Sequence, residues 1–599
     1  MGSHGGPLLR SCKSINAEST GKKRDVKKIL CDSVLLVCVA LIALFCMEWW
    51  IISRLPGPSI AVESTEFSSV QWKGHMGKSL RSKQASIAMH ERLLALAAHA
   101  LAEAEGKKEP EDVWNGPIAQ ASQWKPCSDQ QVLSPPALFP KETSGYILVS
   151  ANGGLNQQRV AVCNAVAVAR LLNATLVIPK FLVSNVWNDN SSQFADIYDI
   201  DFFIDYLQKD LPIVKELPVE LQSLNLDAIG SLVTDMEVPK ESKPSYFLTN
   251  ILPILLRNRV VHFLGFGNRL SFDPIPFEVQ RLRCRCNFHA LRFVPKLQSM
   301  GNILVRRMRS KSLGLGPAEN ELFSAAGSHA LIEKMSSQIG KHLELENLST
   351  GANSKELYTE QNQSSVKFLA LHLRFETDMV AYSMCDFGGG EAEREELQAY
   401  RKIHFPLLAQ LEQDGKLQPA ATLRELGRCP LTPEETVLML SALGLKRGTR
   451  IFLAGAHIYG GQARMVALIN LFPNVITKED LLLSEEMAVF ANHSSQLAAL
   501  DFIVCKEADI FAMTDSGSQL SSLVGGHRMY FGGGHLPTIR PNKRRLASIF
   551  SNSFRIEWQD FEQRVRKTIQ ESNQVDVRPV ARSIYRHPRC HECMCNDIH

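Results

Sequence analysis

The chain has 599 residues, of which 45% are hydrophobic and 21% are charged, and its formal net charge is +4. This length exceeds what a single hydrophobic core usually holds, so we expect more than one globular unit. The net charge is small for a chain of this size. It excludes a general electrostatic affinity for nucleic acid, and we expect no nucleic-acid partner.

The first predicted element is a membrane anchor at residues 33–52, which read SVLLVCVALIALFCMEWWII. A helix of this length spans about 30 Å, the thickness of the apolar part of a bilayer. The preceding tail, residues 1–32, is basic next to the anchor, so the positive-inside rule predicts a cytosolic N-terminus and a lumenal remainder. A cleaved signal peptide is the alternative, but the apolar run is long and no clear small-residue cleavage site follows it.

Residues 53–125 are predicted to form a stem between the anchor and the globular part. Within it, the stretch ASIAMHERLLALAAHALAEAEGKK is rich in Ala, Leu and Glu, which favours a helix. Such a helix could be a spacer, or it could pair two chains in a short coiled coil. The stem is therefore where we expect any homo-oligomer to form.

After residue 126, short apolar runs alternate with helical patterns, which predicts an α/β fold with parallel sheets. The run YILV, a turn, a helix and TLVIP form one β-α-β unit. A second series begins at VKFLALHLRF and continues through TRIFLAG, NVIT, ADIFAMT and RMYFGG. We therefore predict two Rossmann-like lobes facing a cleft, by analogy with the GT-B arrangement of glycosyltransferases. The expected parts are a first lobe at 126–308, a variable linker at 309–365, a second lobe at 366–575 and a Cys-rich tail at 576–599.

Lumenal exposure would permit glycans and disulfides. Five N-x-S/T sequons are candidate glycosylation sites: Asn173, Asn190, Asn347, Asn362 and Asn492. The C-terminal tail contains CHECMC, whose spacing also suits zinc. Zinc prefers four ligands and only three sulfurs are local, so disulfides are favoured in an oxidising compartment.

The first candidate binding motif is SANGGLNQQR, at a predicted strand-to-helix turn. Backbone N–H groups at a helix N-terminus favour an anion or a polar ligand, and Gly153 and Gly154 let that ligand approach the backbone. Asn156, Gln157 and Arg159 would add donors. A capped helix with a solvated first turn explains the stretch equally well.

The second motif, LALHLRFETDM, is a buried strand that ends in His372 and Arg374. A cation at the carboxyl edge of a parallel sheet is placed to meet a ligand, and the arginine fork suits a diphosphate. The alternative is an ion pair that seals the strand end, formed by Arg374 with Glu376 or Asp378.

The third motif, ADIFAMTDSGSQL, has Thr514, Asp515, Ser516, Gly517 and Ser518 in the turn. Hydroxyls and N–H groups at a helix start can hold phosphate without a metal, although a carboxylate at Asp515 would repel it. A capped helix is again the alternative. No motif presents an obvious Asp-x-Asp pair, so we expect a metal-free site.

Two further stretches have weaker signals. LAGAHIYGGQARM contains His457, which could be a general base or a hydrogen-bond donor. GGGHLPTIRPNKRR gathers His535, Arg540, Lys543 and two more arginines, and is expected to be a solvated basic loop. A phosphate contact is the less favoured interpretation of that loop.

Taken together, these stretches resemble the plant protein O-fucosyltransferase-like family of Golgi glycosyltransferases. The matching pieces occur in family order across about residues 143–545: NGGLNQQR, VWNDNSSQFADIYDIDFFI, QRLRCRCNFHALRF, HLRFETDMVAYSMC, GRCPLTPEE, YGGQARM, FPNVITKEDLL, ALDFIVCKEADIF and SQLSSLVGGHR. The resemblance implies a type II Golgi membrane protein with a GT-B fold and no cofactor. It would transfer fucose from GDP-fucose to a hydroxyl of a glycan or protein, with inversion and without a metal.

The resemblance also implies roles for particular residues. Asn156 would lie at the reaction centre, and Arg374 would hold the donor diphosphate, with His372 on the same strand. The turn from Thr514 to Ser518 would hold nucleotide phosphates. Two departures weaken the choice of donor: Ala456-His457 replaces a common Gly-Glu, and the 514–518 turn replaces Tyr-Asp-Gly-Asn-Met. A transferase of rhamnose or mannose, or a non-catalytic Golgi scaffold, is the alternative.

Overall fold

The computed structural model describes residues 90–107, 109–110, 114, 118–129, 142–182, 189, 193–311 and 366–596. The tail at 1–32, the anchor at 33–52, and the sequons at Asn190, Asn347 and Asn362 lie outside the described residues. Within those ranges, no helix combines the length and apolar character needed to cross a membrane.

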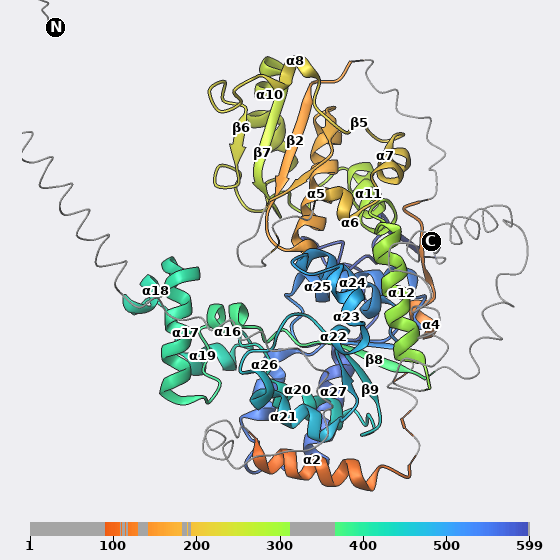
Figure 1. Ribbon diagram of the computed structural model, residues 1–599, viewed down its shortest axis with the longest axis vertical. Helices are drawn as coiled ribbons and strands as arrows, with labels where there is room; N and C mark the ends of the chain where they lie inside the picture. The colour runs from red at the N-terminus through yellow and green to blue at the C-terminus, as the bar shows by residue number, and fades with distance from the viewer. Residues whose placement is uncertain are drawn as a thin grey trace, which may run out of the picture. The chain divides into compact units, whose positions relative to one another are not determined.

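The first lobe is built on a parallel sheet (Figure 1). Its strands follow the order β5-β3-β2-β7-β6, and β4 pairs separately with β2. The strands are β2 (Tyr146–Ala151), β3 (Thr175–Val177), β4 (Lys180–Phe181), β5 (Ile213–Val214), β6 (Leu232–Thr234) and β7 (Val260–Phe266). Its helices are α5 (Leu155–Leu171), α6 (Phe194–Ile197), α7 (Ile200–Leu207), α8 (Val219–Gln222), α9 (Pro244–Tyr246), η3 (Phe247–Ile251), α10 (Leu252–Asn258), α11 (Phe277–Arg285), η4 (Cys286–Ala290) and α12 (Pro295–Arg309).

The second lobe has a five-stranded parallel sheet with the order β10-β9-β8-β11-β12. The strands are β8 (Phe368–His372), β9 (Arg450–Ala454), β10 (Val475–Ile476), β11 (Ile510–Met513) and β12 (Thr538–Ile539). Helices α16 (Thr377–Ser383), α17 (Gly390–His404), α18 (Pro406–Gln413), α19 (Ala420–Glu425) and α20 (Pro433–Ala442) come between β8 and β9. The later helices are α21 (Gly461–Leu471), α22 (Lys478–Leu481), α23 (Ser484–Ala488), α24 (Ser494–Glu507), α25 (Gln519–Phe531), α26 (Lys543–Phe550) and α27 (Trp558–Ser572).

The apolar strand runs explain this architecture. Every residue of β8, β9 and β11 is buried, as expected for parallel strands covered by helices on both faces. The two α/β sheets are therefore confirmed. One predicted strand is wrong: RMYFGG forms the end of α25, where Tyr530 stacks on Phe288 with ring centroids 4.1 Å apart. Tertiary packing in a continuous helix here overrides the strand preference of Tyr and Phe.

The predicted stem contains a helix, α2 (Glu91–Glu103), and it packs on the second lobe. Leu93, Ala97 and Leu101 are buried in the same core cluster as β8 and β9. The apolar face of this helix is thus covered within the chain and is not open for a coiled coil. Short helix α4 (Ile118–Ala121) and strand β1 (Trp124–Pro126) follow.

The C-terminal tail is fastened to the first lobe. Strand β13 (Met594–Asn596) pairs antiparallel with β1, and disulfides join Cys127 to Cys595 and Cys284 to Cys593. These bonds leave Cys590 as the only thiol of the CHECMC motif, so the zinc interpretation fails. A third disulfide, Cys385–Cys429, closes the helical segment between β8 and β9.

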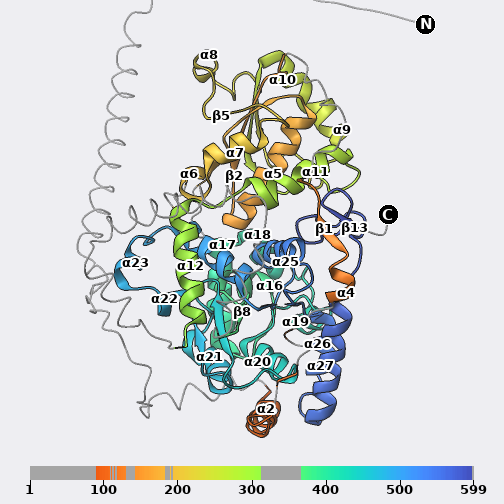
Figure 2. The same ribbon diagram turned by 90° about the vertical axis from the view of Figure 1, so that its right-hand side faces the viewer.

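The two lobes contact each other through the helices that follow the candidate motifs. Helix α25 of the second lobe contacts α5 of the first, and α24 contacts α5 and α6 (Figure 2). Helix α12, at the end of the predicted first lobe, packs along α24. The Arg307 guanidinium on α12 forms a buried ion pair with Glu486 at 2.6 Å. Helix α12, at the end of the first-lobe segment, thus also packs on the second lobe, and the boundary near residue 308 stays a prediction.

Candidate active site

The Gly-Gly turn connects β2 to α5. Gly153 has a φ of 81°, which favours glycine, and Gly154 is the N-cap residue of α5. The Gln157 side chain accepts a hydrogen bond from the Gly154 N–H at 2.7 Å, so Gln157 closes the cap. The Asn156 Oδ1 atom is buried and has no hydrogen-bond partner among the described residues. Within this motif, Asn156 Oδ1 and Gln158 Oε1 are both buried acceptor atoms without a partner among the described residues.

Arg159 does not belong to a ligand site, contrary to the expectation that it adds a donor. Its Nε donates to Asn287 Oδ1 at 3.0 Å and its Nη1 to the Leu291 carbonyl at 3.1 Å. The guanidinium also lies against the rings of Tyr198 and Phe502, each 5.5 Å from the ring centroid. The buried guanidinium therefore ties α5 to η4 and to α24.

Arg374 follows β8 directly and is held by two carboxylates. Its Nη1 lies 2.8 Å from Glu376 Oε2, and its Nη2 lies 2.9 Å from Asp378 Oδ2. Burial works against the charge, but these carboxylates raise the pKa of Arg374 above its ordinary value. The ion pair that the sequence offered as the alternative is thus present, and the side chain is still 14% exposed.

His372, the last residue of β8, is buried between two neighbouring strand ends. Its Nδ1 lies 3.2 Å from the Ala454 carbonyl at the end of β9, and its Nε2 lies 3.0 Å from Ser518 Oγ. Burial and then the nearby charge of Arg374 lower the pKa of His372 to about 4. The imidazole is therefore neutral at physiological pH, and it positions Ser518 and the end of β9.

The 514–518 turn meets the end of β8. The Arg374 backbone N–H donates to Thr514 Oγ1 at 2.9 Å, and the Thr514 N–H donates to the His372 carbonyl at 3.1 Å. Ser518 is the N-cap residue of α25 and its side chain does not cap the helix. Arg374, His372, Thr514 and Ser518 are therefore brought together at the carboxyl edge of the sheet, where the sequence predicted them.

Asp515 has a structural explanation that the sequence missed. One carboxylate oxygen accepts from the Gly517 N–H at 2.6 Å, and the other lies 2.7 Å from Lys543 Nζ. Lys543 comes from the stretch that was expected to be a solvated loop. Its ammonium offsets the charge that would otherwise repel phosphate at this turn. Ser516 and Gly517 complete the turn.

A buried ion pair supports the end of β9. Lys478 Nζ lies 3.1 Å from Asp501 Oδ2 and donates to the Gly455 carbonyl at 2.8 Å, while the Gly455 N–H donates to Asp501 at 3.1 Å. Burial raises the pKa of Asp501 to about 6, although Lys478 opposes that shift. Gly455, with a φ of 124°, lies beside Glu376 and His372; Lys478 and Asp501 belong to two of the quoted stretches, but the sequence did not indicate that they meet here. His457, two residues after Gly455, is exposed.

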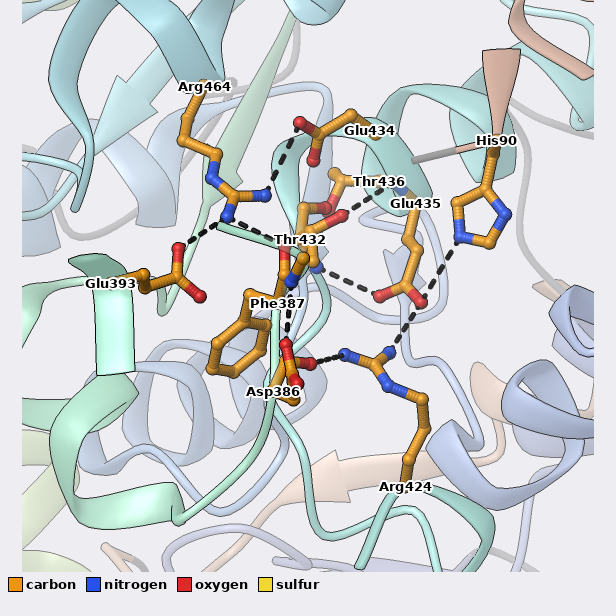
Figure 3. Close-up of polar contacts among 11 residues, drawn as sticks. His90, Asp386, Phe387, Glu393, Arg424, Thr432, Glu434, Glu435, Thr436 and Arg464 are labelled. Carbon is orange, nitrogen blue, oxygen red and sulfur yellow. Dashed lines mark hydrogen bonds and ion pairs between the residues drawn. The ribbon is translucent and has the colours of Figure 1, made fainter. Parts of the chain in front are cut away.

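Two family-like motifs form a structural network, not a ligand site (Figure 3). Arg464 of YGGQARM is 1% exposed and lies 2.7 Å from Glu393 and 3.8 Å from Glu434. Glu435 of GRCPLTPEE closes the N-cap of α20 and pairs with Arg424 at 2.7 Å. The network fastens α17, α19 and α20 to one another and to α21.

Other predicted sites have these outcomes. Asn173 donates from Nδ2 to the Glu142 carbonyl at 3.1 Å, and Asn492 is exposed. No group of three or more His, Cys, Asp or Glu side chains in the described ranges is arranged to hold a metal ion. One Asp-x-Asp triplet does occur, but Asp199 caps α7 and Asp201 pairs with Lys215 at 2.7 Å.

Comparison with known proteins assigns the chain. The family model described as GDP-fucose protein O-fucosyltransferase matches residues 146–531. The chain belongs to this O-fucosyltransferase family. Of its relatives in Arabidopsis thaliana, O-fucosyltransferase 15 is 56% identical over 506 residues, covering 84% of this chain and 73% of that protein. O-fucosyltransferase 2 is 49% identical over 607 residues, covering 98% of this chain and 92% of that protein.

A solved structure of POFUT1 in complex with GDP-fucose also matches, with a TM-score of 0.34 and 12% identity. The match covers 67% of this chain and 99% of that one, and it adds nothing to the assignment. Family membership makes the chain an O-fucosyltransferase-family glycosyltransferase. The matched range includes Asn156 after β2, His372 and Arg374 at the end of β8, and the 514–518 turn. These residues of the candidate site therefore lie within the range that the family model matches.

Proposed function

We propose that this glycosyltransferase transfers fucose from GDP-fucose to a hydroxyl of a glycan or protein, with inversion and without a metal. The observation that carries the proposal is the contact between the end of β8 and the 514–518 turn. There the Arg374 N–H donates to Thr514 Oγ1 at 2.9 Å, next to the start of α25. A guanidinium at a strand end and a helix N-terminus without a side-chain cap are each suited to a diphosphate.

In the proposed mechanism, the second lobe binds the donor and Arg374 moves part of its pairing from Glu376 and Asp378 to the diphosphate. As the bond from the sugar to the diphosphate breaks, negative charge grows on the leaving group, and Arg374 and the α25 N-terminus stabilise it. Groups of this kind typically contribute roughly 2.7–4 kcal/mol to the lowering of a barrier.

Asn156 is proposed to act on the acceptor side. Its buried Oδ1 has no partner among the described residues, so it can accept a hydrogen bond from the hydroxyl that attacks the sugar. Asn156 lies at the start of α5, a first-lobe helix that contacts α25 of the second lobe, and the proposed role rests on its unused acceptor atom. Neutral His372 is a positioning residue in this scheme, not a base.

A single-pass Golgi location with a lumenal catalytic part belongs to the same proposal. It is supported by the apolar sequence at 33–52 and by three disulfides, which form and persist in oxidising compartments. Asn492, which is exposed, is the sequon that we expect to be glycosylated among the described residues, with Asn173 as a second candidate.

A donor screen tests the proposal. The full-length chain, purified in neutral detergent, is incubated with GDP-fucose, GDP-mannose or UDP-rhamnose and a panel of glycan and peptide acceptors, and nucleotide release is measured. We expect release from GDP-fucose alone, and its loss in Arg374→Gln. Release from UDP-rhamnose or GDP-mannose would favour a transferase of that sugar. Donor binding with no turnover over the whole panel would favour the scaffold.

A further inference from the structure

A pocket of about 290 Å³ lies on the second lobe, apart from the contacts of the candidate active site. It is bordered by residues of α25, α27, the segment around β12 and the C-terminal tail, together with Ala121 of α4. Arg528, Arg540, Arg566 and Arg589 line it, and no aspartate or glutamate is among the described residues of its wall. We call this the basic pocket.

The four arginines differ in how their donors are used. Arg528 is buried and donates only to backbone carbonyls, including those of Ala508 and Pro537, so it is a structural residue. Arg566 lies 3.0 Å from Glu562 on its own helix and is 24% exposed. Arg540 donates to the Gly525 carbonyl at 3.3 Å and has no ion pair among the described residues. Arg589 is 9% exposed, and its Nε has no hydrogen-bond partner there.

The surroundings of the pocket are strongly positive. Burial, followed by Arg586 and Arg589, lowers the pKa of Arg540 to about 10, and burial with nearby arginines lowers the pKa of His587 to about 4. The acidic groups that act on these arginines are Glu562, paired with Arg566, Asp576, near Arg589, and Asp515, near Arg586. Asp515 already pairs with Lys543 and Glu562 with Arg566, so Asp576 is the acidic group left near Arg589, and none of the described acidic residues pairs with Arg540. Buried charges without partners are costly, which favours a ligand that supplies the counter-charge.

We propose that the basic pocket binds an oxyanion, a carboxylate or phosphate group, of a ligand other than the donor nucleotide. Arg540 and Arg589 would hold the oxyanion inside the pocket through their planar forks, and Arg566 would meet it at the rim. Gln570, Ser572 and Asn573 on the same wall offer groups for hydroxyls of a sugar. The proposal does not depend on the proposed function.

The shared chemistry has two sources, a uronate of an acidic saccharide and a phosphate group. Two probes separate them: a trimer of galacturonate and inorganic phosphate, with neutral galactotriose as the blank. Binding is measured by titration calorimetry on the full-length chain in neutral detergent. We expect at least one anion to bind and the neutral trimer not to bind.

Two residues of α27 provide a matched pair of variants. Arg564 and Arg566 each pair with a carboxylate four residues earlier, but only Arg566 lines the pocket. Arg566→Gln is expected to weaken the binding of the anion roughly tenfold, the typical loss of a charge-assisted contact, and Arg564→Gln to leave it unchanged. Arg540→Lys, which keeps the buried charge and the fold but loses the fork, is expected to weaken it as well.

Each outcome decides something. Binding of galacturonate that depends on Arg566 and Arg540 assigns an acidic saccharide, and the same dependence for phosphate assigns a phosphate group. Absence of binding for both anions, or equal affinities in the Arg566→Gln and Arg564→Gln variants, overturns the proposal. Arg374→Gln serves as the separate control, because it should reduce GDP binding and leave the binding of the pocket anion unchanged.

Discussion

Arg464 and Arg374, both in the second lobe, each pair with two carboxylates, but their surroundings differ. Arg464 is 1% exposed, and it also donates to the Phe387 carbonyl at 2.7 Å. Arg374 is 14% exposed and lies at the edge where β8, β9 and β11 end. The same charge pattern therefore stabilises a buried helical segment in one place and leaves a cation at a site edge in the other. An ion pair alone does not tell a structural arginine from a functional one.

The largest effect should come from Arg464→Gln. This change leaves Glu393 and Glu434 buried without their cation, and breaking a buried pair in this way costs about 3–5 kcal/mol. We expect the free energy of unfolding in urea to fall by that amount. Arg394→Gln is the control, because Arg394 pairs with Glu391 on the surface, and it should leave the unfolding midpoint unchanged. Equal midpoints for the two variants would show that the buried network is not a stabilising feature.

Arg374→Gln should act on catalysis instead. Loss of a cation that stabilises the leaving diphosphate should raise the barrier by roughly 2.7–4 kcal/mol, on the order of a hundred- to thousand-fold in kcat/KM for GDP-fucose. Arg374→Lys should recover only part of the activity, because an ammonium cannot bond two oxygens in one plane. If Arg374→Gln instead lost stability as Arg464→Gln does and kept its turnover, the distinction between the two arginines would be lost.

The pH dependence of stability tests the burial of His372, which lies at the end of β8 beside Arg374. The pKa of His372 is about 4 in the folded chain and about 6.5 in an unfolded one, so between these values only the unfolded state takes up the proton. The free energy of unfolding should therefore fall as the pH is lowered from about 6.5 to about 4, by roughly 3 kcal/mol from this residue. Urea titrations of wild type and His372→Gln across this pH range isolate the contribution of His372 to the free energy of unfolding. Parallel curves would mean that His372 titrates normally.

The smallest effect is expected from Lys543→Ala. Without its ammonium, the Asp515 carboxylate at the 514–518 turn should repel the donor phosphates. We expect GDP affinity to fall by about 1 kcal/mol, roughly fivefold, in titration calorimetry, and Lys543→Arg to restore most of it. A tighter GDP complex in Lys543→Ala would place the phosphates elsewhere.

Much of this arrangement follows from local sequence. Apolar runs such as FLALH predicted buried parallel strands, and the residues just after them predicted which side chains meet at the sheet edge. The partners of those side chains were harder to predict, because they come from distant segments. Lys478 and Asp501 support the end of β9 from two separate helices, and Lys543 reaches Asp515 from another.

Predictions made from polar residues were wrong in two opposite ways. Arg159, beside the Gly-Gly turn, was expected to donate to a ligand. Its guanidinium instead donates to Asn287 and Leu291 and packs against three aromatic rings. Arg540, in an apparently solvated basic loop, faces a pocket and contacts α25. The charge of a residue does not predict whether it is buried, because burial depends on which helix packs over the residue in the folded chain.

The most direct test of the central claim compares the affinities of GDP and guanosine for wild type and Arg374→Gln by titration calorimetry. If Arg374 holds the diphosphate, wild type should bind GDP at least tenfold more tightly than guanosine, since charge-assisted hydrogen bonds are worth about 1.5–3 kcal/mol. Arg374→Gln should reduce that ratio and leave the affinity for guanosine unchanged. An unchanged ratio in the variant would contradict the account, and Arg374 would then be, like Arg464, a structural cation.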